Sequence, residues 1–226
     1  MIRIDILSAV PQLLESFVRH SIVGRAVREG RVDIRLHDLH DHGLGRYRQI
    51  DDYPYGGGAG MVLRPEPVAA WIQQLQKDRT YDEIIFMTPD APVLTQNTVH
   101  ELALKSNIII IAGHYKGLDQ RIRDRYVTRE ISIGDYVLSG GELPAAVLTD
   151  AIVRLIPGAM NDETSALTDS FQNGLLSAPV YTRPVEFQGM KVPHVLRSGN
   201  HAAIEKWSEQ QSYEKTRRLR PDLLDE

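Results

Sequence analysis

The sequence predicts an α/β fold built on a parallel sheet, and two observations support this. Residues 83–88 (EIIFMT) and 107–113 (NIIIIAG) are continuous apolar runs of strand length. Strands buried on both faces of a parallel sheet lack the alternation of polar and apolar residues that half-exposed strands show. Segments with helical spacing lie between the strand candidates, which indicates βαβ units with right-handed crossovers.

The first part of the chain supplies five elements. Residues 2–8 (IRIDILS) are a short strand candidate. Apolar residues at helical spacing predict a single helix over 11–29. Residues 31–39 alternate like a strand, 40–63 form a long loop rich in Asp, Tyr and Gly, and 66–76 form a second helix.

The middle of the chain continues the same alternation of strands and helices. The apolar strands 83–88 and 107–113 flank a predicted helix over 95–106. A further strand is expected over 126–134 (YVTREISIG), and an amphipathic helix follows over 142–156.

A change of composition marks a boundary after this helix. Residues 157–174 (PGAMNDETSALTDSFQNG) are polar and interrupted by Pro and Gly, which predicts a linker. The residues that follow, helical towards the end in HAAIEKWSEQQSYEKTRRL, predict a small second domain with a limited core of its own.

Composition narrows the function classes. The chain has no cysteine, which excludes disulfides, thiolate metal sites and a cysteine nucleophile. It has no run of about 18 apolar residues that could span a bilayer. The first residues, MIRIDILSAVPQLL, lack the charged start, apolar block and cleavage site of a signal peptide. We therefore expect a cytoplasmic protein with no membrane partner.

Charge does not by itself identify a partner. The net charge is −4 at pH 7, and residues 171–226 carry eight Lys or Arg against seven Asp or Glu. Bulk charge of this kind is not typical of a nucleic-acid-binding protein. Two local clusters remain, each either a solvated helix face or a contact to an anion: Arg121, Arg123, Arg125 and Arg129, and Lys215, Arg217, Arg218 and Arg220.

Several common ligand motifs are absent. The sequence has no GxxxxGK[ST] phosphate loop, no GxGxxG that opens the first helix and no HExxH. HDLHDH, at residues 37–42, gathers three His and two Asp, but its spacing matches no standard metal pattern. This stretch is either a metal site or a polar surface loop.

Turns follow the strand candidates, and all of them except MTPD carry glycine. They are MTPD (87–90), GHYKG (113–117) and IGDYVLSGGE (133–142), and YGGGAGM (55–61) ends the long loop. Each can be plain turn chemistry, because Gly adopts positive φ without strain. Ligands of open α/β sheets bind at the carboxyl ends of the strands, so three such turns together predict a pocket. Without a basic cradle, a ligand read by backbone groups and apolar walls is favoured over a phosphate-rich nucleotide.

Seven stretches, in this order and spacing, resemble the bacterial tRNA (guanine(37)-N1)-methyltransferase family, TrmD, of the SPOUT class. They are YGGGAGM, AGHYKGLDQR, SIGDYVLSGGELPA, RLIPG, DSFQNGLL, YTRP and VPHVLRSGNH, and the resemblance runs from residue 2 to residue 224. SIGDYVLSGGELP is the most specific of them, whereas YGGG alone is a weak signal.

The resemblance implies an α/β parallel-sheet domain with a deep trefoil knot in the loops at the carboxyl ends of its strands, and a small, mainly helical C-terminal domain. True knots are rare exceptions to the rules of chain topology, so pattern alone does not predict one. The implied domains are 1–158 for cofactor binding and catalysis, 159–170 for a linker that carries the base, and 171–226 for tRNA binding. An obligate homodimer with shared active sites is implied as well.

The family's site residues carry over by motif. S-adenosyl-L-methionine, in a bent shape, would lie against Thr88, Pro89, Gly113, Tyr115, Ile133, Gly134, Tyr136, Leu138, Gly140, Gly141 and Pro144. The tRNA would lie against Gly57, Gly58, Ala59, Gly60, His114, Lys116, Ser165, Arg183, Arg197, Arg217 and Arg218. His201, Lys215 and Arg220 add further cationic groups to the C-terminal region. The catalytic pair would be Asp169 in DSF and Arg154 in RLIPG.

Those two residue types suit methylation of guanine. N1 of guanine carries a proton at neutral pH, and a positioned carboxylate can remove it as general base. Negative charge then develops towards O6, where a guanidinium supplies fixed donors. Taken without the resemblance, Asp169 is typical of a helix N-cap or Asx turn, and Arg154 of a surface helix.

This sequence departs from the common family pattern at two positions. Many members have Arg and Glu where this chain has His114 and Lys116. The family Glu is linked to magnesium dependence, and a charged Lys cannot be a metal ligand. Lys116 therefore counts against magnesium dependence, and we expect the activity to survive chelation better than that of relatives with the Glu. Lys116 would instead hold a phosphate or the methionine carboxylate. The loss of a permanent charge at His114 would either weaken RNA binding or make it pH-sensitive.

Two other functions are considered beside methylation of guanosine 37. One is a SPOUT methyltransferase that acts on another RNA position, against which the DSF stretch and the upstream Arg154 both count. The other is a non-catalytic RNA-binding protein whose knot senses S-adenosyl-L-methionine, and the intact Asp169 and Arg154 count against it.

Overall fold

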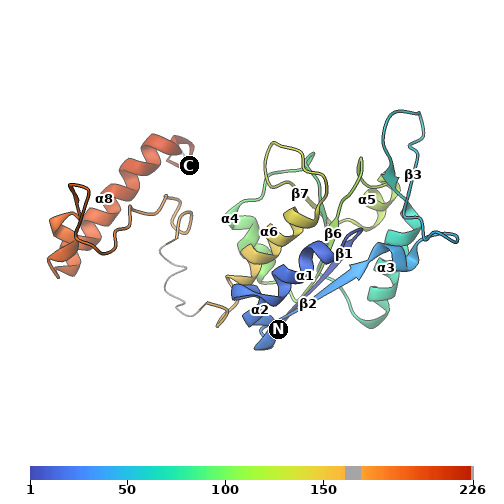
Figure 1. The fold of residues 1–226 in the computed structure, drawn as a ribbon, viewed down its shortest axis with the longest axis horizontal. Coiled ribbons are helices and arrows are strands. Elements are labelled where there is room, and N and C mark those ends of the chain that lie inside the picture. The colour runs from blue at the N-terminus through green and yellow to red at the C-terminus, as the bar shows by residue number, and fades with distance from the viewer. Residues whose placement is uncertain (161–168, 225–226) are drawn as a thin grey trace. The chain divides into compact units, whose positions relative to one another are not determined.

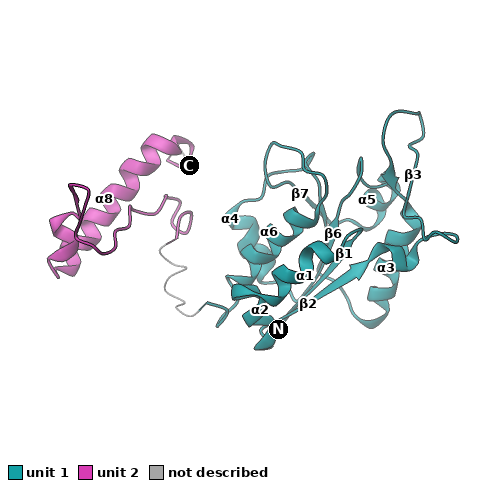
Figure 2. Ribbon diagram, viewed as in Figure 1, with its two compact units in different colours: residues 1–161 teal, residues 162–226 magenta. Residues whose placement is uncertain are grey.

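The computed structural model describes residues 1–160 and 169–224. The chain divides into two compact units, residues 1–161 and 162–226, coloured separately in Figure 2. The division falls inside the segment for which the sequence predicts a linker. Each unit is described by itself below.

The first unit is built on a five-stranded sheet in the order β2-β1-β6-β5-β7. Every neighbouring pair is parallel, which confirms the predicted α/β fold (Figure 1). The strands are β1 (Ile2–Ser8), β2 (Val32–Asp38), β5 (Glu83–Met87), β6 (Asn107–Ala112) and β7 (Arg129–Ile131).

Side chains of the central strands alternate between two cores, one on each face of the sheet. In β6, Ile108 and Ile110 face one core and Ile109 and Ile111 face the other, and all four are fully buried. This double burial explains why the strand reads as an unbroken apolar run. Four helices cover the first face (Figure 1): α1 (Gln12–Arg19), α2 (Ser21–Arg28), α4 (Gln96–Ala103) and α6 (Glu142–Val153). Two cover the other: α3 (Pro65–Asp78) and α5 (Gln120–Tyr126).

The prediction of one helix over 11–29 is wrong, because the chain breaks between α1 and α2. His20 is extended, at φ −120° and ψ 167°, and Ser21 has φ 56°. Gly24 then lies against the backbone of Arg19, where a methyl group would come within 3.1 Å of the Arg19 Cα. Both helices bury apolar residues in the same core, so the apolar spacing runs through the break and hides it.

The segment before the opening of α6 also differs from the prediction. Residues 120–126 form α5, a helix that the sequence did not predict, and the strand expected over 126–134 is limited to β7. Asp119 caps α5 by accepting a hydrogen bond from the Arg121 N–H at 2.9 Å. After β7 the chain has no regular structure until α6, and this irregular stretch of residues 132–141 borders the site.

Short elements complete both units. The loop over 40–63 contains the 3₁₀ turn η1 (Leu39–His42) and a two-residue ladder of β3 (Asp51–Asp52) with β4 (Val62–Leu63). The second unit has a hairpin of β8 (Glu186–Phe187) and β9 (Met190–Lys191), the turns η2 (His194–Arg197) and η3 (Pro221–Leu223), and the long helix α8 (His201–Leu219).

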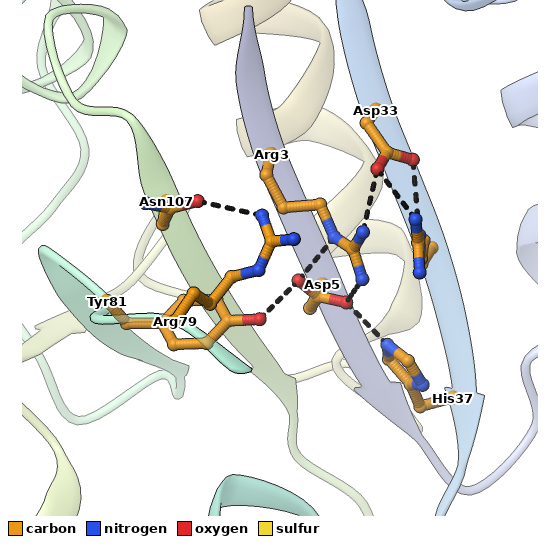
Figure 3. A network of polar contacts seen from close by, with 8 residues as sticks. Arg3, Asp5, Asp33, His37, Arg79, Tyr81 and Asn107 are labelled. Carbon is orange, nitrogen blue, oxygen red and sulfur yellow. Dashed lines mark hydrogen bonds and ion pairs between the residues drawn. The ribbon is translucent and has the colours of Figure 1, made fainter. Parts of the chain in front are cut away.

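A buried ionic network ties β1 to its neighbours (Figure 3). The Asp5 carboxylate is fully buried and accepts two hydrogen bonds from Arg3, both at 2.7 Å, and one from the Tyr81 hydroxyl at 2.7 Å. His37 on β2 lies 2.6 Å from the same carboxylate, and Arg3 also reaches Asp33 at 2.7 Å. Burial alone would raise the pKa of Asp5, but the hydrogen bonds from His37, Arg3 and Tyr81 outweigh it and hold the pKa well below its usual range.

Candidate active site

A cavity of about 530 Å³ lies at the carboxyl ends of β5, β6 and β7. Its walls come from the turn after β5, the loop 113–118 after β6 and the segment 131–144, which starts at the last residue of β7. Parallel strands place their carboxyl ends at one edge of the sheet, which is where ligands of open α/β sheets bind. The volume lies within the range of small-molecule sites.

All eleven residues that the family resemblance assigns to the cofactor line this cavity. Thr88 and Pro89 lie in the first turn, Gly113 and Tyr115 in the second loop, and the other seven in the third segment: Ile133, Gly134, Tyr136, Leu138, Gly140, Gly141 and Pro144. Two residues assigned to RNA, His114 and Lys116, line it as well. Three stretches far apart in the sequence are thus brought together.

Two of these stretches touch backbone to backbone. The Gly141 N–H donates to the Gly113 carbonyl oxygen at 2.5 Å, and His114 pairs with Gly140 in a single antiparallel bridge. A methyl group on Gly141 would lie 2.9 Å from the Ala112 carbonyl carbon and closer still to the Gly113 nitrogen. Gly141 has φ −86°, so it is close approach and not backbone conformation that requires a glycine here.

Gly134 serves a different purpose. Its φ of 145° lies in the region that favours glycine, and a methyl group there would meet the Tyr136 ring. Tyr136 closes a small turn, since its N–H donates to the Gly134 carbonyl at 2.9 Å and its hydroxyl donates to the Ile133 carbonyl at 3.2 Å. The segment is thereby folded back on itself as one wall of the cavity.

An ion-pair network that the sequence did not reveal supports the wall formed by β5. Arg123 donates to Asp90 at 3.1 Å and to Glu130 at 2.7 and 2.8 Å, and its guanidinium lies 5.4 Å from the centre of the Phe86 ring. The bonds to Glu130 and Asp90 raise the pKa of Arg123. A hydrogen bond from Thr88, followed by those from Arg123, lowers the pKa of Asp90. Asp90 lies in the MTPD turn that the sequence marked, whereas Arg123 lies on the unpredicted helix α5.

A buried carboxylate lies behind the loop after β6. Glu142, the first residue of α6, is 2% exposed and accepts a hydrogen bond from the Ser8 hydroxyl at 2.9 Å. Its other oxygen lies 3.5 Å from Nδ1 of His114. The His114 ring meets the Tyr115 ring edge to face, with centroids 4.9 Å apart. Partial burial, followed by the charge of Asp51, raises the pKa of Tyr115.

The glycine-rich loop adjoins the cavity through Lys116. The Lys116 N–H donates to the Met61 carbonyl at 2.9 Å, and a methyl group on Gly60 would lie 2.8 Å from the Lys116 Cγ. The predicted substrate residues Gly57, Gly58, Ala59 and Gly60 are all exposed, and the three glycines have positive φ.

The predicted catalytic residues belong to different units. Arg154 is the half-buried residue at the carboxyl end of α6, in the first unit. Asp169 is half-buried and lies in the second unit. In that unit Arg183, Arg197, Arg217 and Arg218 are exposed, with the last two in the final turn of α8. Ser165 lies outside the residues that the structure describes.

The three histidines of the HDLHDH stretch contact three different partners. His37 contacts Asp5 at 2.6 Å, His40 contacts Asp38 at 2.8 Å, and His42 contacts Gln74 at 2.9 Å. Over residues 1–160 and 169–224, no three His, Asp or Glu side chains are grouped so that they could hold a metal ion. Within the same ranges, no helix is both long and apolar enough to cross a bilayer.

Comparison with known proteins identifies the family. The family model described as tRNA (Guanine-1)-methyltransferase TrmD matches residues 2–226. A tRNA (guanine-N(1)-)-methyltransferase of Christiangramia forsetii is 58% identical over 224 residues, which cover 99% of both chains. A protein of the same name from Flavobacterium psychrophilum is 56% identical, and the match covers 99% of both chains. One from Chlorobium luteolum is 55% identical, and the match covers 100% of this chain and 97% of the relative. The chain therefore belongs to the tRNA (guanine-1)-methyltransferase family TrmD.

Proposed function

We propose that this protein transfers the methyl group of S-adenosyl-L-methionine to N1 of guanosine 37 in tRNA, next to the anticodon. The observation that carries the proposal is the family match over residues 2–226, together with a cavity lined by all eleven residues assigned to the cofactor. A methyltransferase of another RNA position, or a cofactor-sensing RNA-binding protein, would share the cavity but would not require both Asp169 and Arg154.

The cavity suits S-adenosyl-L-methionine in size and chemistry. Four of its glycines, Gly113, Gly134, Gly140 and Gly141, leave backbone groups open to a nucleoside, and Ile133 and Leu138 supply apolar walls. A nucleoside can be recognised in this way without a basic phosphate cradle. The bound cofactor supplies an activated methyl group on a sulfonium, and the protein's part is to align the acceptor with it.

Asp169 and Arg154 act on the target guanine in this proposal. Asp169 removes the proton from N1 of the target guanine, which makes N1 nucleophilic. Arg154 donates hydrogen bonds towards O6, where negative charge develops. The guanine must leave the base stack to reach the cofactor, and the small residues of the loop 57–60 allow close approach to it.

A homodimer with composite sites and a trefoil knot complete the proposal. Three apolar side chains on or next to α6 are exposed: Val137 at 81%, Leu143 at 60% and Val147 at 47%. An apolar group of this kind is typical of a surface that a partner covers. The contact of Gly141 with Gly113 supports the close crossing of loops that a knot requires.

The second unit supplies phosphate contacts in this proposal. The exposed Arg183, Arg197, Arg217 and Arg218 can position tRNA through its backbone without reading the sequence. Lys116 stands at the position where the family resemblance implies a Glu linked to magnesium. Because its ammonium cannot be a metal ligand, we expect methyl transfer that does not depend on Mg²⁺.

One labelling experiment separates the three functions. The protein is incubated with radiolabelled S-adenosyl-L-methionine and with tRNA transcripts in which the nucleoside after the anticodon is guanosine or is replaced. The proposal predicts label in the transcript only when guanosine is present. Label that persists after the replacement would indicate another RNA position, and no label on any RNA would contradict the enzymatic function.

A further inference from the structure

A buried nitrogen of His114 lies near a buried carboxylate, that of Glu142. Nδ1 of His114 has no hydrogen-bond partner. Among the buried side-chain atoms of the described residues, the Thr149 hydroxyl is the one other atom without a partner. Oε2 of Glu142 lies 3.5 Å from Nδ1, within ion-pairing distance. Gly140 permits this arrangement, because a methyl group on it would lie 2.6 Å from Nδ1.

Glu142 needs a compensating positive charge. Its side chain is 2% exposed, and a carboxylate buried without compensation costs several kcal/mol. The Ser8 hydroxyl satisfies one oxygen, and the amino end of α6 contributes a partial positive charge. The second oxygen points at Nδ1 of His114, and a protonated imidazole there would complete the compensation.

We propose that Glu142 is a positioning residue that acts through His114. The buried carboxylate holds the imidazole as a cation with Nδ1 turned inward, so that the ring presents Nε2–H to an anionic group of the ligand in the cavity. The His114 side chain lines the cavity and remains 24% exposed, which leaves it accessible from that side. The inference rests on the proposed function and names a recognition element of the same site.

Lys116 supports the anionic character of that ligand group. It lines the cavity two residues after His114, and no carboxylate among the described residues lies within ion-pairing distance of its ammonium. Two cations of one loop therefore face the same space. The matching group is a carboxylate or a phosphate, supplied by the methionine part of the cofactor or by the tRNA backbone.

The charge of His114 makes this contact pH-dependent. The titratable and charged groups around it are Glu142 on α6, Tyr115 and Lys116 on its own loop, and Asp51 on β3, which acts through Tyr115. Histidine side chains generally lose their charge between about pH 5 and pH 8. Affinity for the ligand that carries the anion should therefore be about tenfold lower when the imidazole is neutral than when it is protonated.

The test measures the dissociation constant of S-adenosyl-L-methionine by calorimetry, and KM and kcat for a tRNA transcript, from about pH 6 to pH 8.5. A change in the cofactor constant assigns the anion to the carboxylate, and a change in the tRNA KM assigns it to a phosphate. The variants are Glu142→Gln, which keeps an acceptor for Ser8, His114→Arg, which carries a permanent cation, and the two combined. Leu104→Ala, at an 87% exposed position between the end of α4 and the start of β6, is the matched control.

We expect the affinity for the ligand that carries the anion to depend on pH in the same way in the wild type and in Leu104→Ala. At pH 7, Glu142→Gln should bind that ligand about tenfold more weakly than the wild type. The affinity of His114→Arg for it should not change with pH. The double variant should keep the affinity of His114→Arg, because an arginine needs no carboxylate to be charged. A double variant as weak as Glu142→Gln, or identical profiles for Glu142→Gln and the wild type, would overturn the inference.

A second variant guards against a folding defect. If Glu142→Gln does not fold, the same pH series is measured with His114→Gln. An affinity that no longer changes with pH supports the inference, and an affinity that still changes with pH overturns it. Failure of the proposed function is distinguishable, because it would appear as a wild type that methylates no tRNA at any pH.

Discussion

Substitution of Gly141 by Ala tests the backbone contact that builds the cavity. The added methyl group would lie 2.9 Å from the Ala112 carbonyl carbon and 3.0 Å from its Cα, so the two segments must separate. Overpacking of this kind costs about 1–3 kcal/mol. Loss of the hydrogen bond from Gly141 to Gly113 adds about 1 kcal/mol. We expect the free energy of unfolding to fall by about 2–4 kcal/mol.

Separation of the two segments also moves groups on both sides of the cofactor. We expect the affinity for S-adenosyl-L-methionine, measured by calorimetry, to fall at least about tenfold, and the melting temperature to fall by about 4–16 °C. Gly30→Ala is the matched control, since Gly30 has φ 68° and no atom within 4 Å of an added methyl group. It should lose about 1–2 kcal/mol through backbone strain and keep its affinity for the cofactor. If Gly141→Ala binds the cofactor as tightly as the wild type, the contact does not shape the site.

Four further predictions follow from the same structure. Asp169→Asn should slow single-turnover methyl transfer by about 10²–10⁴-fold and leave the cofactor dissociation constant unchanged; a rate near that of the wild type would exclude Asp169 as general base. Asp5→Asn should cost about 3–5 kcal/mol at pH 7 in chemical denaturation, because it breaks a buried ion pair. The pKa of Asp5 is lowered in the folded state. Its contribution to the free energy of unfolding is therefore fully present above the unfolded pKa of about 3.9 and is lost as the pH falls towards the folded pKa. The difference in unfolding free energy between Asp5→Asn and the wild type should accordingly be smaller at pH 3 than at pH 7. EDTA should leave activity largely intact because Lys116 cannot bind a metal, and complete loss that Mg²⁺ restores would contradict this. Val147→Glu, at an exposed apolar position on α6, should dissociate the proposed homodimer in sedimentation velocity, whereas Leu104→Ala should not.

The sheet could be predicted because burial on both faces leaves a direct trace in the sequence. After their first residues, Glu83 and Asn107, the runs at β5 and β6 are entirely apolar, and the helices between strands follow from apolar spacing. The break at His20 could not be predicted, since α1 and α2 bury residues in one core and the spacing continues across it. The helix α5 was missed because it is rich in arginine and buries one residue, Ile122.

The cavity, too, could be predicted only in part from the sequence. Its glycines could be located from their position after strands, and the family resemblance assigned them to the cofactor. The role of Gly141 as a contact point with Gly113 depends on a meeting between segments far apart in the chain, which no local pattern encodes. The ion pairs of Arg123 and the burial of Glu142 depend on the same tertiary meeting.

Identification of the modified nucleoside tests the central claim most directly. A tRNA transcript with guanosine at position 37 is incubated with the protein and S-adenosyl-L-methionine, digested to nucleosides and analysed by mass spectrometry beside authentic standards. The account predicts 1-methylguanosine, absent when position 37 is replaced and absent with Asp169→Asn. A methylated nucleoside of another kind, or 1-methylguanosine that persists after position 37 is replaced, would contradict it.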